Sequence, residues 1–400
     1  MENEVKKQRA LPWVTLAITI ILMIAYTALS LNSALEFERY LTLGLFIGAI
    51  ALSIVVIILN LVYKVNRNDD SYYDRIESIG SRYTIYEVVL LSLPLLIEVV
   101  GAFCIPDFYD LYSEHTATFA LIMTVVVSYF CAFPLLALSS RKLPKMVIAQ
   151  RNMGAGVFFA CVAMTAGLAM IGTLIGSPIH TALTKPFTNG EETYDVAKIV
   201  LETTLWERGL VVGVLAPIFE ELLFRKILID RTIGYGQSMS IVLSGVMFGL
   251  FHGNFQQFFF ATLIGMLFAL VYIRTGRIRY TIFLHMAVNL TTSVVTVSFA
   301  QKILPYMEDI DSYADLPSDV MPYFFLFSMW IMFLIFVAIL GVIFLIVWHK
   351  RLKPVRLVGE PSAIETLGGM VRSPLFWCFT IITLLHFIET YLPDIVAYVI

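Results

Sequence analysis

The sequence is poor in charged residues. Only 14% of its 400 residues are Asp, Glu, Lys or Arg, whereas about 25% is usual in soluble domains. Hydrophobic types make up 59% of the chain, and the mean hydropathy is +0.83. A soluble globule cannot bury so much apolar surface, so the composition excludes a soluble enzyme, a disordered tail and a fibrous protein. It indicates an all-α, polytopic membrane protein.

Cysteine is scarce too, and its four positions lie in or at the ends of apolar stretches. They are Cys104, Cys131, Cys161 and Cys378. This distribution provides neither a disulfide framework nor a zinc cluster. The net charge of −3 gives no sign of nucleic-acid binding, and the absence of a Walker A sequence argues against a nucleotide-driven pump.

Several protease signatures are also missing. None of the six His residues is followed by Glu, so there is no H-E-x-x-H zinc motif. No G-x-G-D motif of the aspartyl intramembrane type occurs. Val242 stands where a rhomboid motif would place Gly ahead of Ser244. The sequence therefore disfavours these three kinds of protease.

Long apolar runs, in contrast, are abundant. A spanning helix needs roughly 20 apolar residues, and eleven segments approach that length. They are 11–32, 41–63, 83–105, 118–140, 154–176, 205–229, 238–253, 256–273, 280–300, 322–348 and 374–392. The short pair at 238–253 and 256–273 predicts a turn below the outer surface and an internal polar cavity. Residues 72–82 have a weak amphipathic pattern and could lie flat on the inner surface.

Basic residues favour one orientation. Most of the 27 Lys and Arg fall on one side if the N-terminus, with Lys6, Lys7 and Arg9, is cytoplasmic. The outer loop near 302–320 then holds five carboxylates. They are Glu308, Asp309, Asp311, Asp315 and Asp319. We expect an integral membrane protein, in the plasma membrane, with a cytoplasmic N-terminus.

Segment 209–229 carries an unusual polar load. Glu220, Glu221 and Arg225 together cost about 8–10 kcal/mol on insertion, against about 4–8 kcal/mol gained from apolar residues. Glu221 and Arg225 are at i, i+4 and can form an ion pair. Glu220 points about 100° away and has no local cation, which suits a general base. Alternatively, Glu220 and Glu221 share Arg225 in a structural network.

The next two helices add further polar groups. His252 follows Phe248 by one turn at the end of a short helix, and His285 lies one turn before Asn289. Asn is a poor resident of a membrane helix unless it bonds to something. A single His in a bundle is more often structural, but these groups fall on three helices within 70 residues. At a rise of about 1.5 Å per residue, His252 lies one or two helical turns further from the inner membrane surface than Glu220, His285 and Asn289, unless its helix is tilted or re-entrant.

Three motifs thus follow one another on successive helices. They read Glu220-Glu221-x-x-x-Arg225, Phe248-x-x-x-His252 and His285-x-x-x-Asn289. Their order resembles the CPBP family of CAAX-protease and bacteriocin-processing intramembrane proteases, also called Abi proteins, which includes the Ras-converting CAAX endopeptidase. The resemblance covers about residues 205–300. Lys226 stands where many members have Gly.

The resemblance implies proteolysis within the membrane by a conical or bundle-like helical core. By family analogy, Glu220 and His252 activate the attacking water, while His285 and Asn289 stabilise the oxyanion. Carboxylate and imidazole can accept protons, and imidazole and amide N–H groups can donate to an oxyanion. The supporting residues are Glu221, Arg225 and Phe248.

The cofactor stays open at this point. Many family members are described as metalloproteases, and the ligands here would be Glu220, His252 and His285, with one position left for water. The residues do not choose between zinc and no metal.

The resemblance also suggests a division of the chain and a class of partner. We expect accessory helices at 1–153, a core at 154–301, and a loop with two accessory helices at 302–400. The partners are membrane lipids and a membrane-associated peptide or protein, without nucleic acid or nucleotide. Such a substrate could be a prenylated C-terminus, a leader peptide, a pheromone precursor or a bacteriocin.

Two other functions remain. Embedded Glu98, His386 and Glu389 could mark the ion path of a transporter, although no repeat of broken helices is visible and packed positions explain these residues as well. Glu87, near the start of its helix, is expected to snorkel. A catalytically idle scaffold or immunity protein is the other alternative.

Overall fold

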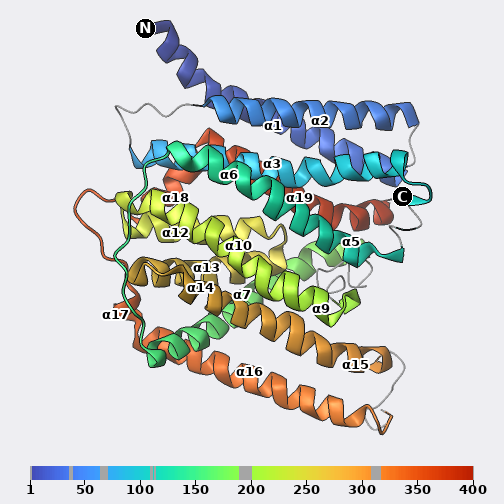
Figure 1. The fold of residues 1–400 in the computed structure, drawn as a ribbon, viewed down its shortest axis with the longest axis vertical. Helices are drawn as coiled ribbons and strands as arrows, with labels where there is room; N and C mark the ends of the chain where they lie inside the picture. The colour runs from blue at the N-terminus through green and yellow to red at the C-terminus, as the bar shows by residue number, and fades with distance from the viewer. Residues whose placement is uncertain are drawn as a thin grey trace.

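The computed structural model describes residues 2–35, 39–63, 71–108, 111, 114–188, 201–307 and 317–399. Within these ranges the chain is helical and contains no strand. The long helices run in broadly similar directions, in layers from α1 and α2 through the middle of the molecule to α16 (Figure 1). The predicted all-α, polytopic bundle is confirmed.

The first half of the bundle ends with α7. Its elements are α1 (Glu2–Leu35), α2 (Arg39–Val62), α3 (Tyr72–Cys104), α5 (Thr116–Met123), η1 (Thr124–Ala132), α6 (Phe133–Ser139), η2 (Ser140–Lys142) and α7 (Ala155–Thr188). The helix α3 has 33 residues and includes the stretch 72–82. The expectation that 72–82 lies flat is therefore wrong, because Ser71 caps a continuous helix and most of this stretch is buried.

The second half contains the motif-bearing helices. Its elements are α9 (Leu205–Glu207), η3 (Arg208–Leu215), α10 (Ala216–Glu221), η4 (Leu222–Ile227), α11 (Leu228–Thr232), η5 (Ile233–Tyr235), α12 (Gln237–Phe251), α13 (Phe255–Thr275), α14 (Ile278–Asn289), η6 (Leu290–Thr296), α15 (Val297–Met307), α16 (Met321–Val347), α17 (His349–Leu352), α18 (Ala363–Arg372) and α19 (Pro374–Val399).

All eleven predicted segments coincide with helical stretches. In the described part of the chain, eight helices are long and apolar enough to cross a membrane, or up to nine if the bent pair α18–α19 forms one span. The helix α12 is apolar but has only 15 residues. The segment from α9 to α11 is divided by wide π-helical turns in η3 and η4.

The helices α12 and α13 form the short hairpin that the sequence predicts. They meet at Gly253, which has φ +66°, a backbone conformation that glycine adopts without strain. A Cβ on Gly249 would lie 2.0 Å from the Thr262 Oγ1 atom, and one on Gly245 would lie 3.0 Å from the Thr262 carbonyl oxygen. The two glycines thus let α12 approach α13 closely, as small residues do in membrane bundles.

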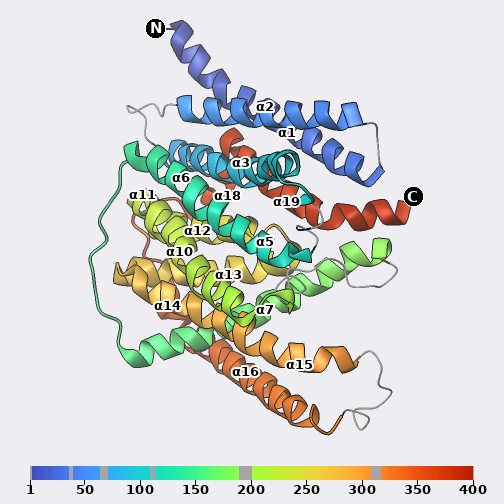
Figure 2. The same cartoon turned by 45° about the vertical axis from the view of Figure 1, so that its right-hand side comes forward.

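Accessory helices pack directly onto the motif-bearing ones. Figures 1 and 2 show α3, α6 and α19 beside the α10–α12 region. The Tyr83 hydroxyl donates to the Leu223 carbonyl at 2.7 Å, and Tyr129 stacks on Phe219 at 4.1 Å between ring centroids. The division at residues 153 and 301 stays a prediction.

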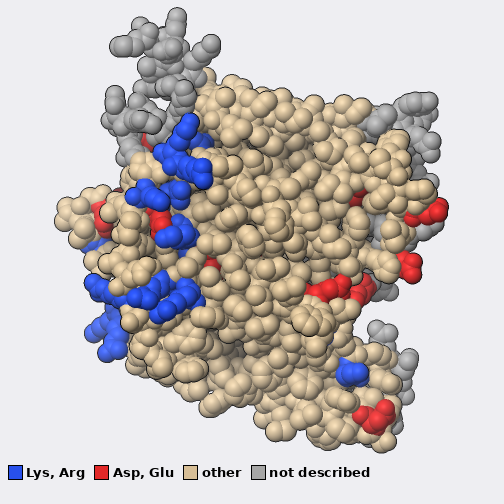
Figure 3. All heavy atoms as spheres, in the orientation of Figure 1, with Lys and Arg blue, Asp and Glu red and all other residues tan. Residues whose placement is uncertain are grey.

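Charges separate along the bundle. On the face in Figure 3, Lys and Arg gather at the end where α17 and α18 lie, and acidic residues are more frequent towards the other end. Some charges used to predict the orientation lie outside the described residues. They are the side chains of Lys6, Lys7 and Arg9 and the outer-loop acids Glu308, Asp309, Asp311 and Asp315. The observed separation agrees with a chain that spans a membrane.

Candidate active site

Glu221 and Arg225 form the predicted i, i+4 pair. The Arg225 Nε atom lies 3.0 Å from the Glu221 Oε2 atom, and both side chains are fully buried. Arg225 also donates to the Ser244 hydroxyl at 2.9 Å and lies over the Phe248 ring at 4.8 Å. An isolated buried guanidinium is costly, and these contacts compensate it from two helices.

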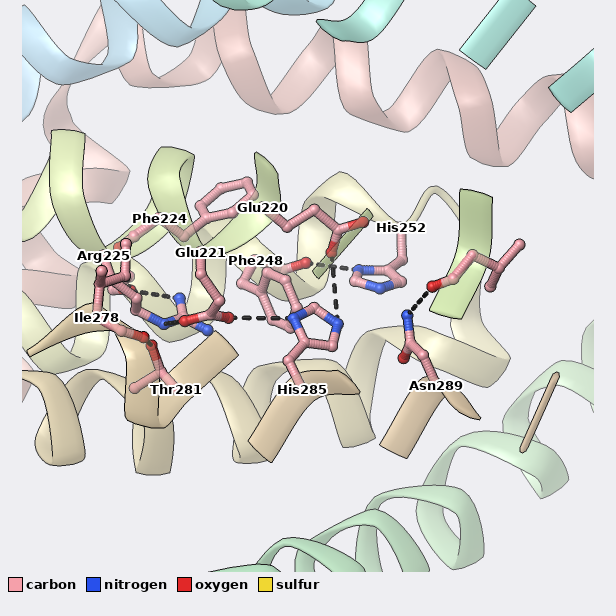
Figure 4. Close-up of polar contacts among 12 residues, drawn as sticks. Glu220, Glu221, Phe224, Arg225, Phe248, His252, Ile278, Thr281, His285 and Asn289 are labelled. Carbon is pink, nitrogen blue, oxygen red and sulfur yellow. Dashed lines mark hydrogen bonds and ion pairs between the residues drawn. The ribbon is translucent and has the colours of Figure 1, made fainter. Parts of the chain in front are cut away.

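His285 continues this polar chain into the site (Figure 4). Its Nδ1 atom lies 3.1 Å from Glu221 Oε1, and its Nε2 atom lies 3.8 Å from Glu220 Oε2. Since a carboxylate only accepts, Nδ1 carries a proton that it donates to Glu221. The Nε2 atom is then directed at Glu220, so His285 separates the two carboxylates.

Glu220 is the carboxylate that does not pair with Arg225 and can therefore interact with a water molecule or a substrate. Its side chain is 15% exposed, and its Oε2 atom makes no hydrogen bond within the described part of the molecule. Figure 4 shows the carboxylate close to both imidazole rings, whereas Arg225 pairs with Glu221. The geometry thus favours separate roles for the two neighbouring acids over equal sharing of Arg225.

His252 lies at the C-terminal end of α12, directly before the Gly253 turn. Its Nδ1 atom is 2.8 Å from the Phe248 carbonyl oxygen. A carbonyl only accepts, so Nδ1 donates and the lone pair of neutral His252 is on Nε2. Figure 4 places this ring near Glu220, although counting residues from the inner end of its helix predicts a deeper position in the membrane. The reason is that α12 is short and ends beside Glu220.

Asn289 is engaged with the backbone of η3. Its Nδ2 atom donates to the Val212 carbonyl oxygen at 2.8 Å. In the wide turns of η3 the backbone N–H of residue i donates to the carbonyl oxygen of residue i−5, and the Ala216 N–H donates in this way to the Val211 carbonyl. Val212 would next pair with residue 217, which is proline and has no N–H. Asn289 satisfies the carbonyl that Pro217 leaves, and its second amide hydrogen is the one available to a substrate.

Phe248 joins these groups. Its ring centroid is 4.9 Å from the ring of His252 and 5.5 Å from that of His285, with near-perpendicular planes in both cases. The Phe248 side chain is fully buried. It therefore separates the two imidazoles from the core and restricts their orientation.

Glu220, His252 and His285 are the candidate ligands for a metal ion at this site. Each imidazole has Nδ1 engaged, and the Nε2 atom of His285 faces Glu220 Oε2 at 3.8 Å. However, no group of three or more His, Cys, Asp or Glu side chains within the described residues is placed to hold a metal ion. The residues as arranged therefore do not fit the three-ligand site that the sequence left open.

Some buried polar residues near the site were missed or misread from the sequence. Glu87 is 1% exposed and lies 3.6 Å from His386 Nε2, so the expectation that Glu87 snorkels is wrong. A buried pair between α3 and α19 explains it better, since the packing of two accessory helices is invisible in sequence. Glu98 has a partner as well, and the side chain of Glu389 lies outside the described residues.

Two comparisons with known proteins found matches. Residues 202–291 match the family model described as "Type II CAAX prenyl endopeptidase Rce1-like". The chain is also 31% identical over 103 residues to the protein named "Putative membrane peptidase YdiL" of Bacillus subtilis (strain 168). That alignment covers 25% of this chain and 40% of the relative. No solved structure matches the chain.

The matched segment contains all three motifs, from Glu220 to Asn289. The resemblance predicted from those motifs is therefore confirmed. The chain spans about two fifths of the length of the curated relative.

Proposed function

We propose that this integral membrane protein, whose residues 202–291 form an Rce1-like domain of the CPBP family, is an intramembrane endopeptidase. The observation that supports this best is that His252 and His285, from two other helices, both lie beside the partly exposed carboxylate of Glu220. A carboxylate next to imidazoles can remove a proton from water inside a bundle that excludes bulk solvent.

In the proposed reaction, Glu220 accepts a proton from a water molecule while His252 Nε2 accepts a hydrogen bond from the same water. The water oxygen attacks the carbonyl carbon of the scissile peptide bond. The oxyanion receives hydrogen bonds from protonated His285 Nε2 and from the second amide hydrogen of Asn289. The C–N bond then breaks, and Glu220 returns its proton to the leaving amine.

The polar chain behind the site supports this assignment. Arg225 compensates Glu221, and Glu221 in turn accepts the Nδ1 proton of His285. A carboxylate in that position orients an imidazole and stabilises its protonated form. Glu221 and Arg225 therefore act as positioning residues, with Phe248 as the apolar partner of both rings.

Water attack is favoured over an acyl-enzyme. The motifs contain no Ser or Cys beside the base, and the hydroxyl of Ser244 is occupied by Arg225 and by the Phe224 carbonyl at 2.8 Å. The mechanism uses side chains and water alone, because the three candidate ligands do not form a metal set.

A lipidated or hydrophobic substrate suits the surroundings of the site. An apolar cavity of about 670 Å³ lies between α7, α14 and α16. Leu284, Ala287 and Val288 contribute to its wall, on the same helix as His285. Pockets of this size hold a single small ligand or chain. We place the protein in the plasma membrane with its basic end in the cytoplasm.

The test is hydrolysis by the detergent-purified protein. A lipidated or strongly apolar fluorogenic peptide should be cleaved by wild type, and Glu220→Gln and His252→Asn should each lower kcat by about 10²-fold or more. The exposed Glu365→Gln is the matched control and should keep full activity. A chelator should leave the rate unchanged. Wild-type turnover that persists in Glu220→Gln would overturn the mechanism.

The alternatives predict different outcomes. An ion-coupled transporter would show solute-dependent proton flux in proteoliposomes that is insensitive to His252→Asn. An idle scaffold or immunity protein would show no cleavage of any peptide while remaining folded. Glu220-dependent cleavage would exclude both.

A further inference from the structure

Tyr86 on α3 carries a buried hydroxyl that is not accounted for. The residue is 1% exposed, and its hydroxyl makes no hydrogen bond of normal distance and angle within the described residues. Buried polar groups are nearly always hydrogen-bonded, and exceptions often mark a functional or water-binding position. Tyr86 lies outside the matched segment and outside every motif of the sequence.

The register of two antiparallel helices places Tyr86 at the site. Tyr83, one turn earlier on α3, donates its hydroxyl to the Leu223 carbonyl at 2.7 Å. Because the chain from α10 to η4 runs opposite to α3, one turn further along α3 corresponds to one turn back from Leu223. That position is Glu220.

The neighbours of Tyr86 agree with this register. Its ring lies 5.9 Å from the ring of Phe251, the residue directly before His252. The phenol is close enough to Glu87, Glu220 and Tyr129 to interact with them electrostatically, and Ser128 is a weak hydrogen-bond partner. The Tyr86 phenol and the Glu220 Oε2 atom, neither of which makes a hydrogen bond of normal distance and angle within the described residues, therefore belong to the same region of the interior.

Contacts made by α19 also restrict the position of Tyr86. The next residue, Glu87, lies 3.6 Å from His386 on α19. A Cβ on Gly253 would come 2.9 Å from the His386 Cβ atom, and Phe387 packs edge-on against Phe255 at 4.9 Å. The helix α19 thus contacts both α3, through Glu87, and the turn that follows His252, through His386, and it links the position of Tyr86 to that of the imidazole.

We propose that Tyr86 is a further catalytic residue, whose hydroxyl donates a hydrogen bond to the water that Glu220 activates. The water would donate its hydrogens to Glu220 and to His252 Nε2 and accept one from Tyr86. One lone pair then remains for attack on the peptide carbonyl. No proton leaves Tyr86 in this step. The inference rests on the proposed function and assigns part of the site to an accessory helix.

Two matched variants test it. Tyr86→Phe removes a hydroxyl whose only protein contact of hydrogen-bond type among the described residues is a weak one to Ser128, so it should change the melting temperature little. It should lower kcat by about tenfold to a hundredfold, as loss of one donor to a reacting group does, with KM changed less than about twofold. Tyr83→Phe removes an equally buried hydroxyl that donates to Leu223, so it should lower the melting temperature but keep kcat.

Each result decides a separate question. Wild-type kcat in Tyr86→Phe, with Glu220→Gln inactive, would overturn the role of Tyr86 and leave the peptidase standing. A melting temperature lowered as in Tyr83→Phe would show that the hydroxyl is structural and would also overturn it. Absence of any Glu220-dependent cleavage by wild type would overturn both proposals together.

Discussion

Glu221 is the residue on which the arrangement of the site depends most. It is fully buried and contacts both Arg225, at 3.0 Å, and His285, at 3.1 Å. A buried ion pair gains little overall, but removing one partner leaves the other uncompensated. Glu221 therefore matters less for net stability than for keeping Arg225 and the His285 tautomer in place.

This argument gives a prediction for Glu221→Gln. The variant retains the size of the side chain but removes its charge, so it should lose about 3–5 kcal/mol of stability, as other broken buried pairs do. Thermal unfolding in detergent measures this loss. Activity should fall too, because a neutral amide holds the Nδ1 proton of His285 less strongly.

The control is an ion pair on the surface. Arg356 and Glu365 lie 3.2 Å apart with both side chains more than half exposed. Glu365→Gln should change stability far less than Glu221→Gln does, because an exposed ion pair contributes little. Equal losses in the two Glu→Gln variants would contradict a special role for Glu221.

Residue chemistry alone identified the polar groups that converge, but not all of their partners. Glu220, His252 and His285 could be singled out because ionisable side chains are rare in apolar helices. Tyr86 gave no such signal, since a tyrosine among apolar residues needs no explanation in sequence. Glu87 was visible, but its partner His386 lies about 300 positions away on another helix.

At the scale of secondary-structure elements, the wide turns of η3 and the proline that follows them shape the helix that carries Glu220. Val212 has no intrahelical donor because residue 217 is proline, and Asn289 on α14 supplies one at 2.8 Å. The same contact ties α14 to the helix that carries Glu220. Asn289 thus has a structural task in addition to the oxyanion role proposed for it.

A double-mutant cycle tests this coupling. Asn289→Ala should cost about 1–3 kcal/mol, because the partly buried Val212 carbonyl loses its donor. In a Pro217→Ala background the restored N–H can bond Val212, so Asn289→Ala should cost clearly less. Unfolding of the four proteins measures the coupling, and strictly additive losses would contradict it.

The helices themselves were largely predictable, but their internal geometry was not. All eleven predicted segments are helical because apolar length and polar interruptions are local properties. The division of 205–229 by two π-helical stretches depends on contacts with α14 and α12. Likewise, the inclusion of 72–82 in α3 follows from burial against α18 and α19, which are distant in sequence.

At the scale of the whole molecule, charge is distributed along the bundle axis. Basic residues gather at the end with α17 and α18 on the face shown in Figure 3. Cytoplasmic ends of membrane proteins are enriched in Lys and Arg. The candidate site around Glu220 lies between the two ends, in the apolar interior, where a membrane-embedded site is expected.

The orientation can be measured with single cysteines. In a variant whose native cysteines are replaced, Val358→Cys at the basic end and Asp319→Cys near the start of α16 provide two exposed probes. An impermeant maleimide should label Asp319→Cys in intact cells and Val358→Cys only after permeabilisation. The reverse pattern would show that the N-terminus is outside.

The sequence by itself determined that the chain is a helical membrane protein, where its helices lie, and which segment carries the CPBP motifs. Composition, run length and short spacings are enough for those conclusions, because the bilayer imposes them on every segment separately. Only the tertiary structure decided that His285 lies between Glu221 and Glu220, that Asn289 bonds the Val212 carbonyl left without a donor by Pro217, and that Tyr83 on α3 bonds Leu223. Those choices depend on the packing of helices against one another, which no local pattern encodes.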